Sequence, residues 1–347
     1  MGGFHLKILL DDFGMFLGRR RGRFSIRGRD KKLEVPVDDV EAIICTSQGV
    51  AFSSSALKLA VEHGVQIIFA GYRGWPYAVL MPTSLTGSVR ARREQFKAYS
   101  DARGFTLARA FVLGKILNQA SLLKLTAKNR RDTDPMLAED LYEAGRSISR
   151  IADRVKAEPE RHVDEARLSL MNLEAEAART YWSAVKKLLP EELGFPGRET
   201  RGAKDPFNAM LNFGYQVVLF PEAWKAVSYA GLDPYAGYLH ADRPGKPSLV
   251  LDIMEEFRQQ VVDRTLLALV SKRVVKPGEI IEEEQGQRLI AKETARKILE
   301  ALEERLDDKA MFRGRRSSIR GLIQVQARNI ARLLLDGVEY RPFTLGW

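Results

Sequence analysis

The sequence predicts an α+β protein: a small N-terminal β-rich domain with one embedded helix, residues 1–86, followed by a larger all-α domain, residues 87–347. Short strand-like runs separated by turn residues fill the first domain. In the second, apolar residues recur at the helical period of about 3.6. A chain of 347 residues also exceeds the length at which one core usually keeps growing, so two domains are expected.

The N-terminal domain is expected to contain strands around one helix. Residues 41–47 form a continuous apolar run typical of a buried strand. A helix is expected at about 53–64, because serines that can cap it stand at its start and Gly64 stands at its end. The expected strands are 5–10, 14–20, 22–28, 32–37, 41–47, 65–71 and 75–81.

The rest of the chain is expected to be helical, with a short extended excursion at 273–283. Asp205 is a natural N-cap and Pro206 a natural first helical residue, so one helix start is well defined. The expected helices span about 88–102, 106–129, 135–156, 163–189, 205–231, 249–272, 289–306 and 319–335.

Composition narrows the class of protein. Hydrophobic residues make up 45% and charged residues 29%, as in an ordinary globular protein. The single cysteine, Cys45, excludes an internal disulfide and a cysteine-based zinc site. The apolar runs are too short to span a membrane, so we expect a cytoplasmic protein with no membrane partner.

The positive charge is clustered. The chain has 55 Lys+Arg against 45 Asp+Glu, a net charge of +10. Clusters of this kind favour a polyanion such as nucleic acid, although any single cluster could be a solvated basic face. The three clusters are Arg19, Arg20, Arg21, Arg23, Arg27, Arg29, Lys31 and Lys32; Arg90, Arg92 and Arg93; and Arg313, Arg315, Arg316 and Arg320.

Glu174 interrupts an apolar helical stripe. Counting in threes and fours from Leu170 places Glu174 where a buried apolar residue is expected. The neighbouring alanines leave room for a bound ion. A core carboxylate paired with Arg179 or with another helix explains the same pattern, so both alternatives remain open.

His240 lies in the Gly/Pro-rich loop 231–247, and the helix after it carries Asp252 and Glu255. These two acids are three residues apart and share a helical face. Imidazole and carboxylates together are typical of a hard or borderline divalent metal site. A loop histidine bonded to backbone, and a Glu255 paired with Arg258, are the structural alternatives. No phosphate-binding glycine loop or dinucleotide fingerprint is present.

Several motifs resemble the Cas1 family, the integrases of CRISPR spacer acquisition, and the resemblance covers essentially the whole chain. LEAEAARTYW is similar to the family's helix with the first metal glutamate, and DPFNAMLNFGY to its Asp-Pro-x-Asn-Ala helix. GLDPYAGYLHADRPGKPSLVLDIMEEFR is close to the second half of the family's site. GMFLGRRRGR and IQVQARNIARLLL resemble its β domain and its last helix.

The resemblance implies a set of site residues. Glu174, His240 and Glu255 are the implied ligands of Mn²⁺ or Mg²⁺, and Asp252 is the implied supporting acid in the catalytic site. Ala175 stands where the family commonly has Gly, which leaves slightly less room. Glu256 is rotated by about 100° from Glu255 on a helix, so we expect it to lie outside the site and its replacement to be nearly silent.

The implied function is that of a metal-dependent DNA endonuclease and integrase of CRISPR adaptation. It inserts captured DNA fragments as spacers into the CRISPR array by phosphodiester transesterification. The implied partners are double-stranded and branched DNA, CRISPR repeat DNA, a second copy of the chain through the β domains, and the small protein Cas2. The clustered arginines would hold the DNA backbone without reading sequence. A non-catalytic architectural DNA-binding protein and a general repair nuclease acting on branched DNA are the alternatives.

Overall fold

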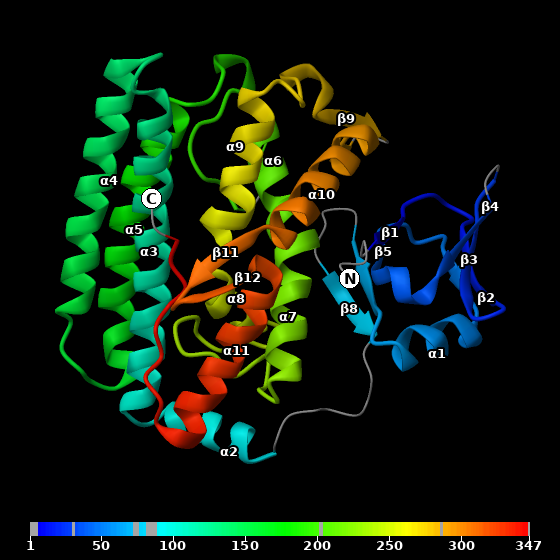
Figure 1. The fold of residues 1–347 in the computed structure, drawn as a ribbon, viewed down its shortest axis with the longest axis horizontal. Helices are drawn as coiled ribbons and strands as arrows, with labels where there is room; N and C mark the ends of the chain where they lie inside the picture. The colour runs from blue at the N-terminus through cyan, green and yellow to red at the C-terminus, as the bar shows by residue number, and fades with distance from the viewer. Residues whose placement is uncertain are drawn as a thin grey trace. The chain divides into compact units, whose positions relative to one another are not determined.

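The structure is a computed structural model and describes residues 6–29, 32–71, 76–80, 89–200, 204–284 and 287–345. The chain divides into two compact units, Met1–Leu85 and Thr86–Trp347. The first is rich in strands and the second is mainly helical (Figure 1), so the expected fold class is confirmed. The expected domain boundary falls within 81–88, outside the described residues.

The described part of the N-terminal unit contains two four-stranded sheets. One has the order β1-β5-β7-β8, with β8 antiparallel to β7 and the other pairs parallel. The second has the order β4-β3-β2-β6. The strands are β1 (Leu6–Leu10), β2 (Phe16–Arg20), β3 (Arg23–Arg27), β4 (Lys32–Pro36), β5 (Val40–Cys45), β6 (Ala51–Phe52), β7 (Gln66–Ala70) and β8 (Pro76–Leu80).

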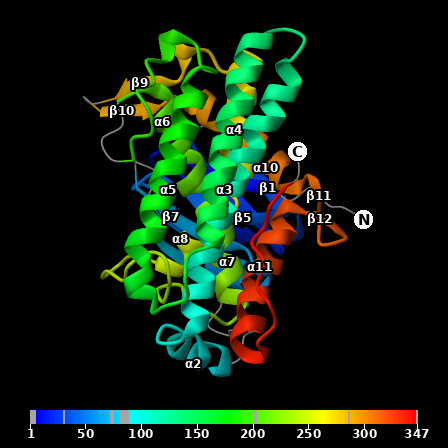
Figure 2. The ribbon, with the colours of Figure 1, turned by 90° about the vertical axis from the view of Figure 1, so that its left-hand side faces the viewer.

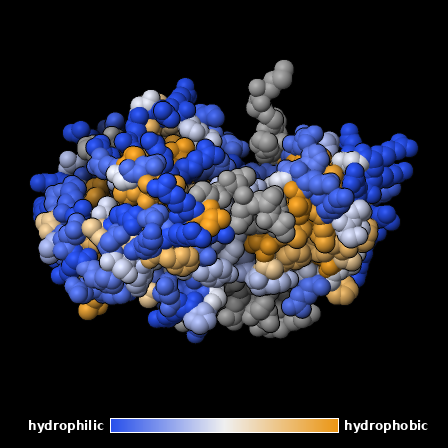
Figure 3. Space-filling model, turned by 90° about the horizontal axis from the view of Figure 1, so that it is seen from below, coloured by the Kyte–Doolittle hydropathy of each residue, from blue (hydrophilic) through white to orange (hydrophobic). Residues whose placement is uncertain are grey.

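One hydrophobic core joins these sheets to helix α1 (Ser54–Glu62). Leu17, Phe24 and Ile43 are fully buried in it. The expected cap of α1 is present, because the Ser53 hydroxyl accepts a hydrogen bond from the Ala56 amide at 3.2 Å. Apolar residues also gather on the surface of this unit (Figure 3), and Tyr77 on the outer strand β8 is 69% exposed. A sheet edge with an exposed aromatic residue can pair with another chain.

The second unit is built around long helices. Helices α3, α4 and α5 pack side by side along most of their length (Figure 2). Among the described residues, no helix is both long and apolar enough to cross a lipid bilayer. The helices are α2 (Val89–Ala98), α3 (Ala102–Arg130), α4 (Pro135–Lys156), α5 (Val163–Lys186), α6 (Pro206–Phe213), α7 (Phe220–Tyr229), α8 (Ser248–Met254), α9 (Arg264–Ser271), α10 (Lys292–Asp307) and α11 (Ile319–Asp336).

The expected helices over 205–231 and 249–272 are not regular. A π-helical segment, Gly214–Leu219, joins α6 to α7, and another, Gln259–Asp263, precedes α9. The second helix starts at Ser248 and opens into a turn after Met254. Such π-helical turns are often found near functional sites, because they change which side chains face the interior.

An all-α second domain was expected, but the second unit also contains strands. It contains the hairpins β9 (Ile281–Glu284) with β10 (Gln287–Ile290), and β11 (Lys309–Phe312) with β12 (Arg315–Ser318). The turn of the second hairpin has φ 50° at Arg313 and φ 74° at Gly314. Two positive φ values are what a two-residue hairpin turn requires, and an arginine carries no sequence signal for that conformation.

Arg320 was expected to bind DNA, and this prediction is wrong. Its side chain is only 10% exposed, and it joins α11 to α7 and α10. The guanidinium lies 2.5 Å from Glu222, 2.8 Å from Glu303 and 3.1 Å from Asp307. A buried arginine that satisfies three acids serves the packing of the helices, so it offers no surface charge to a phosphate.

We therefore expect Arg320→Ala to destabilise the helical unit by about 3–5 kcal/mol, because it removes the buried cation that pairs with three acids of α7 and α10. Arg316→Ala, on the exposed face of the neighbouring hairpin, is the matched control and should change stability by less than about 0.5 kcal/mol. Urea unfolding followed by circular dichroism measures both values. Similar stabilities for the two variants would contradict the structural role of Arg320.

Candidate functional site

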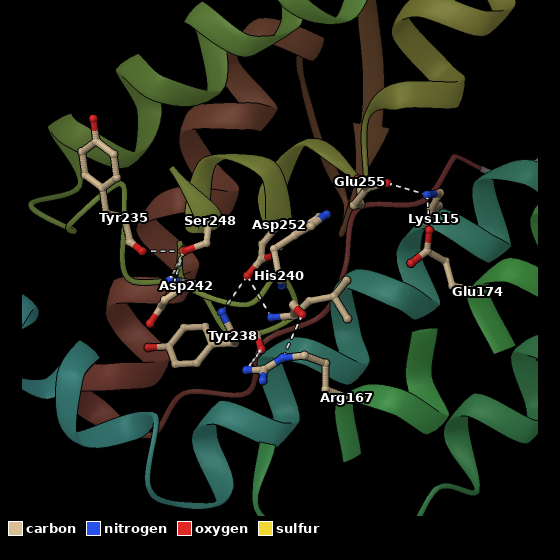
Figure 4. A network of polar contacts seen from close by, with 12 residues as sticks. Lys115, Arg167, Glu174, Tyr235, Tyr238, His240, Asp242, Ser248, Asp252 and Glu255 are labelled. Carbon is tan, nitrogen blue, oxygen red and sulfur yellow. Dashed lines mark hydrogen bonds and ion pairs between the residues drawn. The ribbon is translucent and has the colours of Figure 1, made fainter. Parts of the chain in front are cut away.

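The four predicted site residues come from three segments of the helical unit. Glu174 lies on α5, His240 in the loop between α7 and α8, Asp252 on α8, and Glu255 in the turn that follows α8. Figure 4 shows two sets of contacts: Lys115 of α3 joins Glu174 to Glu255, and Asp252 joins His240. Asp252 and Glu255 are buried, whereas Glu174 and His240 are partly exposed.

The buried carboxylate of Asp252 shapes the loop that carries His240. One of its oxygens accepts hydrogen bonds from the amides of Tyr238 at 2.7 Å and Leu239 at 3.0 Å. The other accepts from the His240 amide at 2.9 Å. Gly237 makes this close approach possible, since a Cβ there would lie 2.8 Å from the same carboxylate. Asp252 thus fixes three consecutive residues of the loop.

Asp252 also orients the imidazole of His240. The distance from His240 Nδ1 to Asp252 Oδ1 is 2.7 Å. Because a carboxylate accepts, we assign the proton to Nδ1, and Nε2 then carries the free lone pair. No hydrogen bond to Nε2 is found within the described residues. A histidine held in this way by a carboxylate is the usual arrangement of a metal-ligating imidazole.

Arg167 of α5 binds the same loop. This residue was not identified from the sequence. Its guanidinium donates to the carbonyl oxygens of Leu239 at 3.1 Å and Tyr238 at 3.2 Å. Arg167 and Glu174 are seven residues apart on α5 and therefore lie on one face of the helix. The contact places His240 on the side of α5 that carries Glu174. The only sequence signal was this spacing.

The two glutamates meet at Lys115. Its ammonium forms an ion pair with Glu174 and lies 2.8 Å from Oε2 of Glu255. Glu255 also pairs through Oε1 with Arg258 at 3.0 Å, as the structural alternative anticipated. The partner of Glu174 is therefore a lysine of another helix, and not Arg179. Both glutamates thus make the ion pairs that their structural alternatives anticipated, and in addition both face the same ammonium.

The charges around Glu255 keep it ionised. Burial alone would raise its pKa, but the nearby positive charges of Arg258 and Lys115 outweigh burial and hold the pKa at about 2. Burial also opposes the charge of Lys115, yet the two glutamates raise the pKa of this ammonium above its usual value. At neutral pH the site thus contains an ionised acid beside a charged lysine.

These residues fit a divalent ion in chemistry, although they do not form a finished coordination shell. Oε2 of Glu255 is buried and forms an ion pair with Lys115 at 2.8 Å, but no described donor has hydrogen-bond geometry to it. Two carboxylates and one imidazole suit Mn²⁺ and tolerate Mg²⁺. Within the described part of the chain, however, no three His, Cys, Asp or Glu side chains gather around one point. The ammonium of Lys115 lies between the two glutamates where an ion would bind both.

Glu256 differs from the expectation of a silent neighbour. It is fully buried, and its carboxylate accepts hydrogen bonds from the Tyr340 hydroxyl at 2.6 Å, the Phe343 amide at 2.7 Å and Gln326 at 2.8 Å. Asn118 of α3 donates to the carbonyl oxygens of both Glu256 and Phe343, at 2.8 Å each. Glu256 therefore holds the segment after α11 against α3. Its side chain points into the core and away from that of Glu255.

The remaining predicted residues lie on the surface of the helical unit. Arg90 and Arg93 of α2 are exposed, whereas Arg92 is partly buried. The residues Arg313, Arg315 and Arg316 are exposed on the β11–β12 hairpin. Apart from the buried Arg320 and the partly buried Arg92, the predicted arginines of this unit are thus exposed to a polyanion in solution.

Comparisons with known proteins identify the family of the chain. Residues 8–304 match the model of the family described as CRISPR associated protein Cas1. The chain is 37% identical to CRISPR-associated endonuclease Cas1 1 of Archaeoglobus fulgidus, over 99% of this chain and 100% of the relative. It is 36% identical to CRISPR-associated endonuclease Cas1 of Korarchaeum cryptofilum, over 96% of this chain and 95% of the relative.

Solved structures show the same fold. A casposase bound to integration product superposes with a TM-score of 0.82 at 22% identity, covering 97% of this chain and 93% of the casposase. A Cas1 protein from Thermotoga maritima gives a TM-score of 0.78 at 23% identity, covering 98% of this chain and 99% of that protein.

A β-rich unit followed by a helical unit with an acidic site, together with these matches, defines a CRISPR-associated nuclease. The chain belongs to the Cas1 family. The main function expected from the sequence, a CRISPR-associated endonuclease and integrase, is confirmed by this membership. Neither alternative, the architectural protein nor the general repair nuclease, is favoured.

The environment of Glu256 leads to a test by pH. Burial raises its pKa to about 7, above the ordinary 4.5, although three hydrogen-bond donors oppose this. The folded protein then keeps a proton that the unfolded chain releases near pH 4.5. The stability that Glu256 contributes is therefore complete below about pH 4.5 and is lost as pH rises through about 7.

We expect Glu256→Gln to lower Tm, because its amide NH₂ would face a hydrogen-bond donor, and to lower it more at pH 5 than at pH 8. Thermal unfolding at both values measures the difference. Glu304→Gln, at an exposed position of α10, should stay close to wild type throughout. A Glu256→Gln deficit that grows as pH rises would contradict the protonated, buried acid.

Proposed function

We propose that this chain is a divalent-metal-dependent DNA endonuclease and integrase whose ion, Mn²⁺ or Mg²⁺, is held by Glu174, His240 and Glu255. The observation that carries the proposal is the convergence of Glu174 and Glu255, from α5 and from the turn after α8, on one buried cation, the ammonium of Lys115. Two acids from separate elements that share a cation form a cation-binding pair. Asp252 supports the set by orienting His240.

The chemistry assigned to the site is phosphodiester transfer. A DNA 3′-hydroxyl or a water attacks phosphorus, one P–O bond forms, another breaks, and the departing oxygen takes up a proton. A bound divalent ion would polarise the phosphoryl oxygen and stabilise charge on the attacking and departing oxygens.

The chain's own residues prepare this step. Arg258 and Lys115 keep Glu255 ionised at neutral pH, so that it can act as a ligand without first losing a proton. Asp252 holds the proton on Nδ1 of His240, so that Nε2 presents its lone pair. Arg258 stays bound to Oε1 of Glu255 and limits the rotation of this carboxylate.

Double-stranded and branched DNA and CRISPR repeat DNA are the proposed substrates. The exposed arginines of α2 and of the β11–β12 hairpin would contact phosphates without reading sequence. Cas2 is a proposed partner, because a solved Cas6-RT-Cas1–Cas2 complex contains a chain of the same fold, with a TM-score of 0.77 at 19% identity. We further propose that the N-terminal unit pairs with a second copy, for which the exposed Tyr77 on the outer strand β8 is available.

Removing the proposed ligands tests the site. With Mn²⁺ and branched DNA, Glu174→Gln, His240→Ala and Glu255→Gln should each lower the cleavage rate by about a hundredfold or more, and a chelator should abolish it. Asp252→Asn should lower it by about 10- to 100-fold, because the orientation of His240 is lost. The control is Glu176→Gln, since Glu176 pairs with Arg154 on α4. Full activity of the His240 variant would refute the ligand assignment.

Salt dependence tests the DNA-binding hairpin. Arg315→Gln and Arg316→Gln are combined with Arg313→Asn, because Asn tolerates the positive φ of the turn. The slope of log affinity against log salt should become shallower by about 0.9 for each phosphate that the variant no longer neutralises. Mn²⁺ binding to the same variant should be unchanged. A wild-type slope would show that the hairpin arginines are only a solvated face.

A further inference from the structure

Lys115 occupies an unusual position for a lysine. Its side chain is only 14% exposed and comes from the middle of α3, and its ammonium faces Glu174 and the buried Glu255. Neither acid is its sequence neighbour. No sequence pattern indicated this residue, because a lysine in a long helix ordinarily lies on a solvated face.

The backbone of Lys115 is fixed relative to Glu255. At the preceding residue, Gly114, a Cβ would lie 2.8 Å from Pro342 and 3.0 Å from Glu256, so α3 approaches the residue after Glu255 as closely as a glycine permits. The lysine side chain itself remains a flexible four-carbon stem with a compact charge at its end. The ammonium can therefore leave the carboxylates although the helix that carries it cannot.

The electrostatics require a cation between the two acids. Glu255 is 4% exposed, and an ionised acid so deeply buried beside a second acid is strongly unfavourable without a positive partner. Arg258 neutralises Oε1 of Glu255, whereas Oε2 faces Lys115 at 2.8 Å. The oxygens of Glu174 and Glu255 that face the ammonium would be free to hold an ion only if the ammonium left them.

We propose that Lys115 is a built-in counter-cation that competes with the divalent ion for Glu174 and Glu255. Binding of the ion then displaces the ammonium, while Arg258 remains on Oε1 of Glu255. The lysine holds the two acids together and at the same time weakens the binding of metal. This inference rests on the proposed function, because it assumes that the two glutamates are metal ligands.

Direct Mn²⁺ titration of the full-length protein, followed by electron paramagnetic resonance of the free ion, tests the competition. Lys115→Met should bind Mn²⁺ about tenfold more tightly than wild type. Lys115→Arg keeps the charge and should bind close to wild type. Lys128→Met is the matched control, since Lys128 is exposed in the last turn of the same helix, and it should leave the affinity unchanged.

Thermal unfolding gives a second readout that does not depend on catalysis. Without metal, Lys115→Met should melt several degrees below wild type, because the two acids repel each other. Saturating Mn²⁺ should raise its Tm more than that of wild type, since the ion replaces the missing charge. If Lys115→Met does not fold without metal, Lys115→Gln, which can donate hydrogen bonds to both acids, replaces it in both measurements.

The possible outcomes separate the two proposals. In one outcome, Glu255→Gln loses Mn²⁺ binding, and a folded Lys115→Met or Lys115→Gln variant binds Mn²⁺ no more tightly than wild type. That outcome refutes the competition and leaves the metal site standing. Mn²⁺ binding that is absent from wild type and from both lysine variants refutes the metal site and the competition with it. Tighter binding in the neutral variants, lost again when Glu255→Gln is added, supports both.

Discussion

The candidate site depends first on the buried carboxylate of Asp252. It accepts hydrogen bonds from the amides of Tyr238, Leu239 and His240 and from the imidazole of His240. A carboxylate in the protein interior is costly unless it is satisfied, and here four donors from one loop satisfy it. The loop adopts this path only because Gly237 has no side chain. The orientation of His240 is therefore a consequence of how Asp252 is satisfied.

A second buried acid holds the other side of the site. Glu256 ties the segment after α11 to α8 and, through Asn118, to α3. Gly114 of α3 contacts Glu256 where α3 meets the turn after α8. Lys115 follows Gly114 in the chain, and Glu255 precedes Glu256. The packing of Gly114 against Glu256 therefore sets the distance between the backbones of Lys115 and Glu255. Stability and site geometry are coupled there, because the burial of Glu256 becomes unfavourable as it ionises.

The chain belongs to the Cas1 family, and its β-rich and helical units follow the fold of that family. Helices of this unit carry Glu174 and Asp252, whereas a loop carries His240 and a turn carries Glu255. Residues held by short hydrogen bonds on rigid elements keep their geometry when a large polyanion binds nearby. The fold shared with a casposase and with a Cas1 protein from Thermotoga maritima shows that this scaffold persists at 22–23% identity.

The sequence alone determined the division into a β-rich and a helical part, most helix starts, and the family. Local signals are sufficient for these features: Ser53 and Asp205 cap their helices as expected, and periodicity reports which face is apolar. The same local rules put Glu174, His240, Asp252 and Glu255 forward as candidates, because each interrupts a pattern or belongs to a family motif.

Only the tertiary structure decided which charges meet. Lys115, Arg167 and Arg320 have partners 59, 72 and 98 positions away along the chain, so no spacing rule could pair them. Arg320 was misjudged and the burial of Glu256 was not foreseen for one reason: a charged residue in a sequence carries no sign of whether water or a distant partner will satisfy it. That choice is made by packing between helices, where a buried charge persists only if its partner is brought to it.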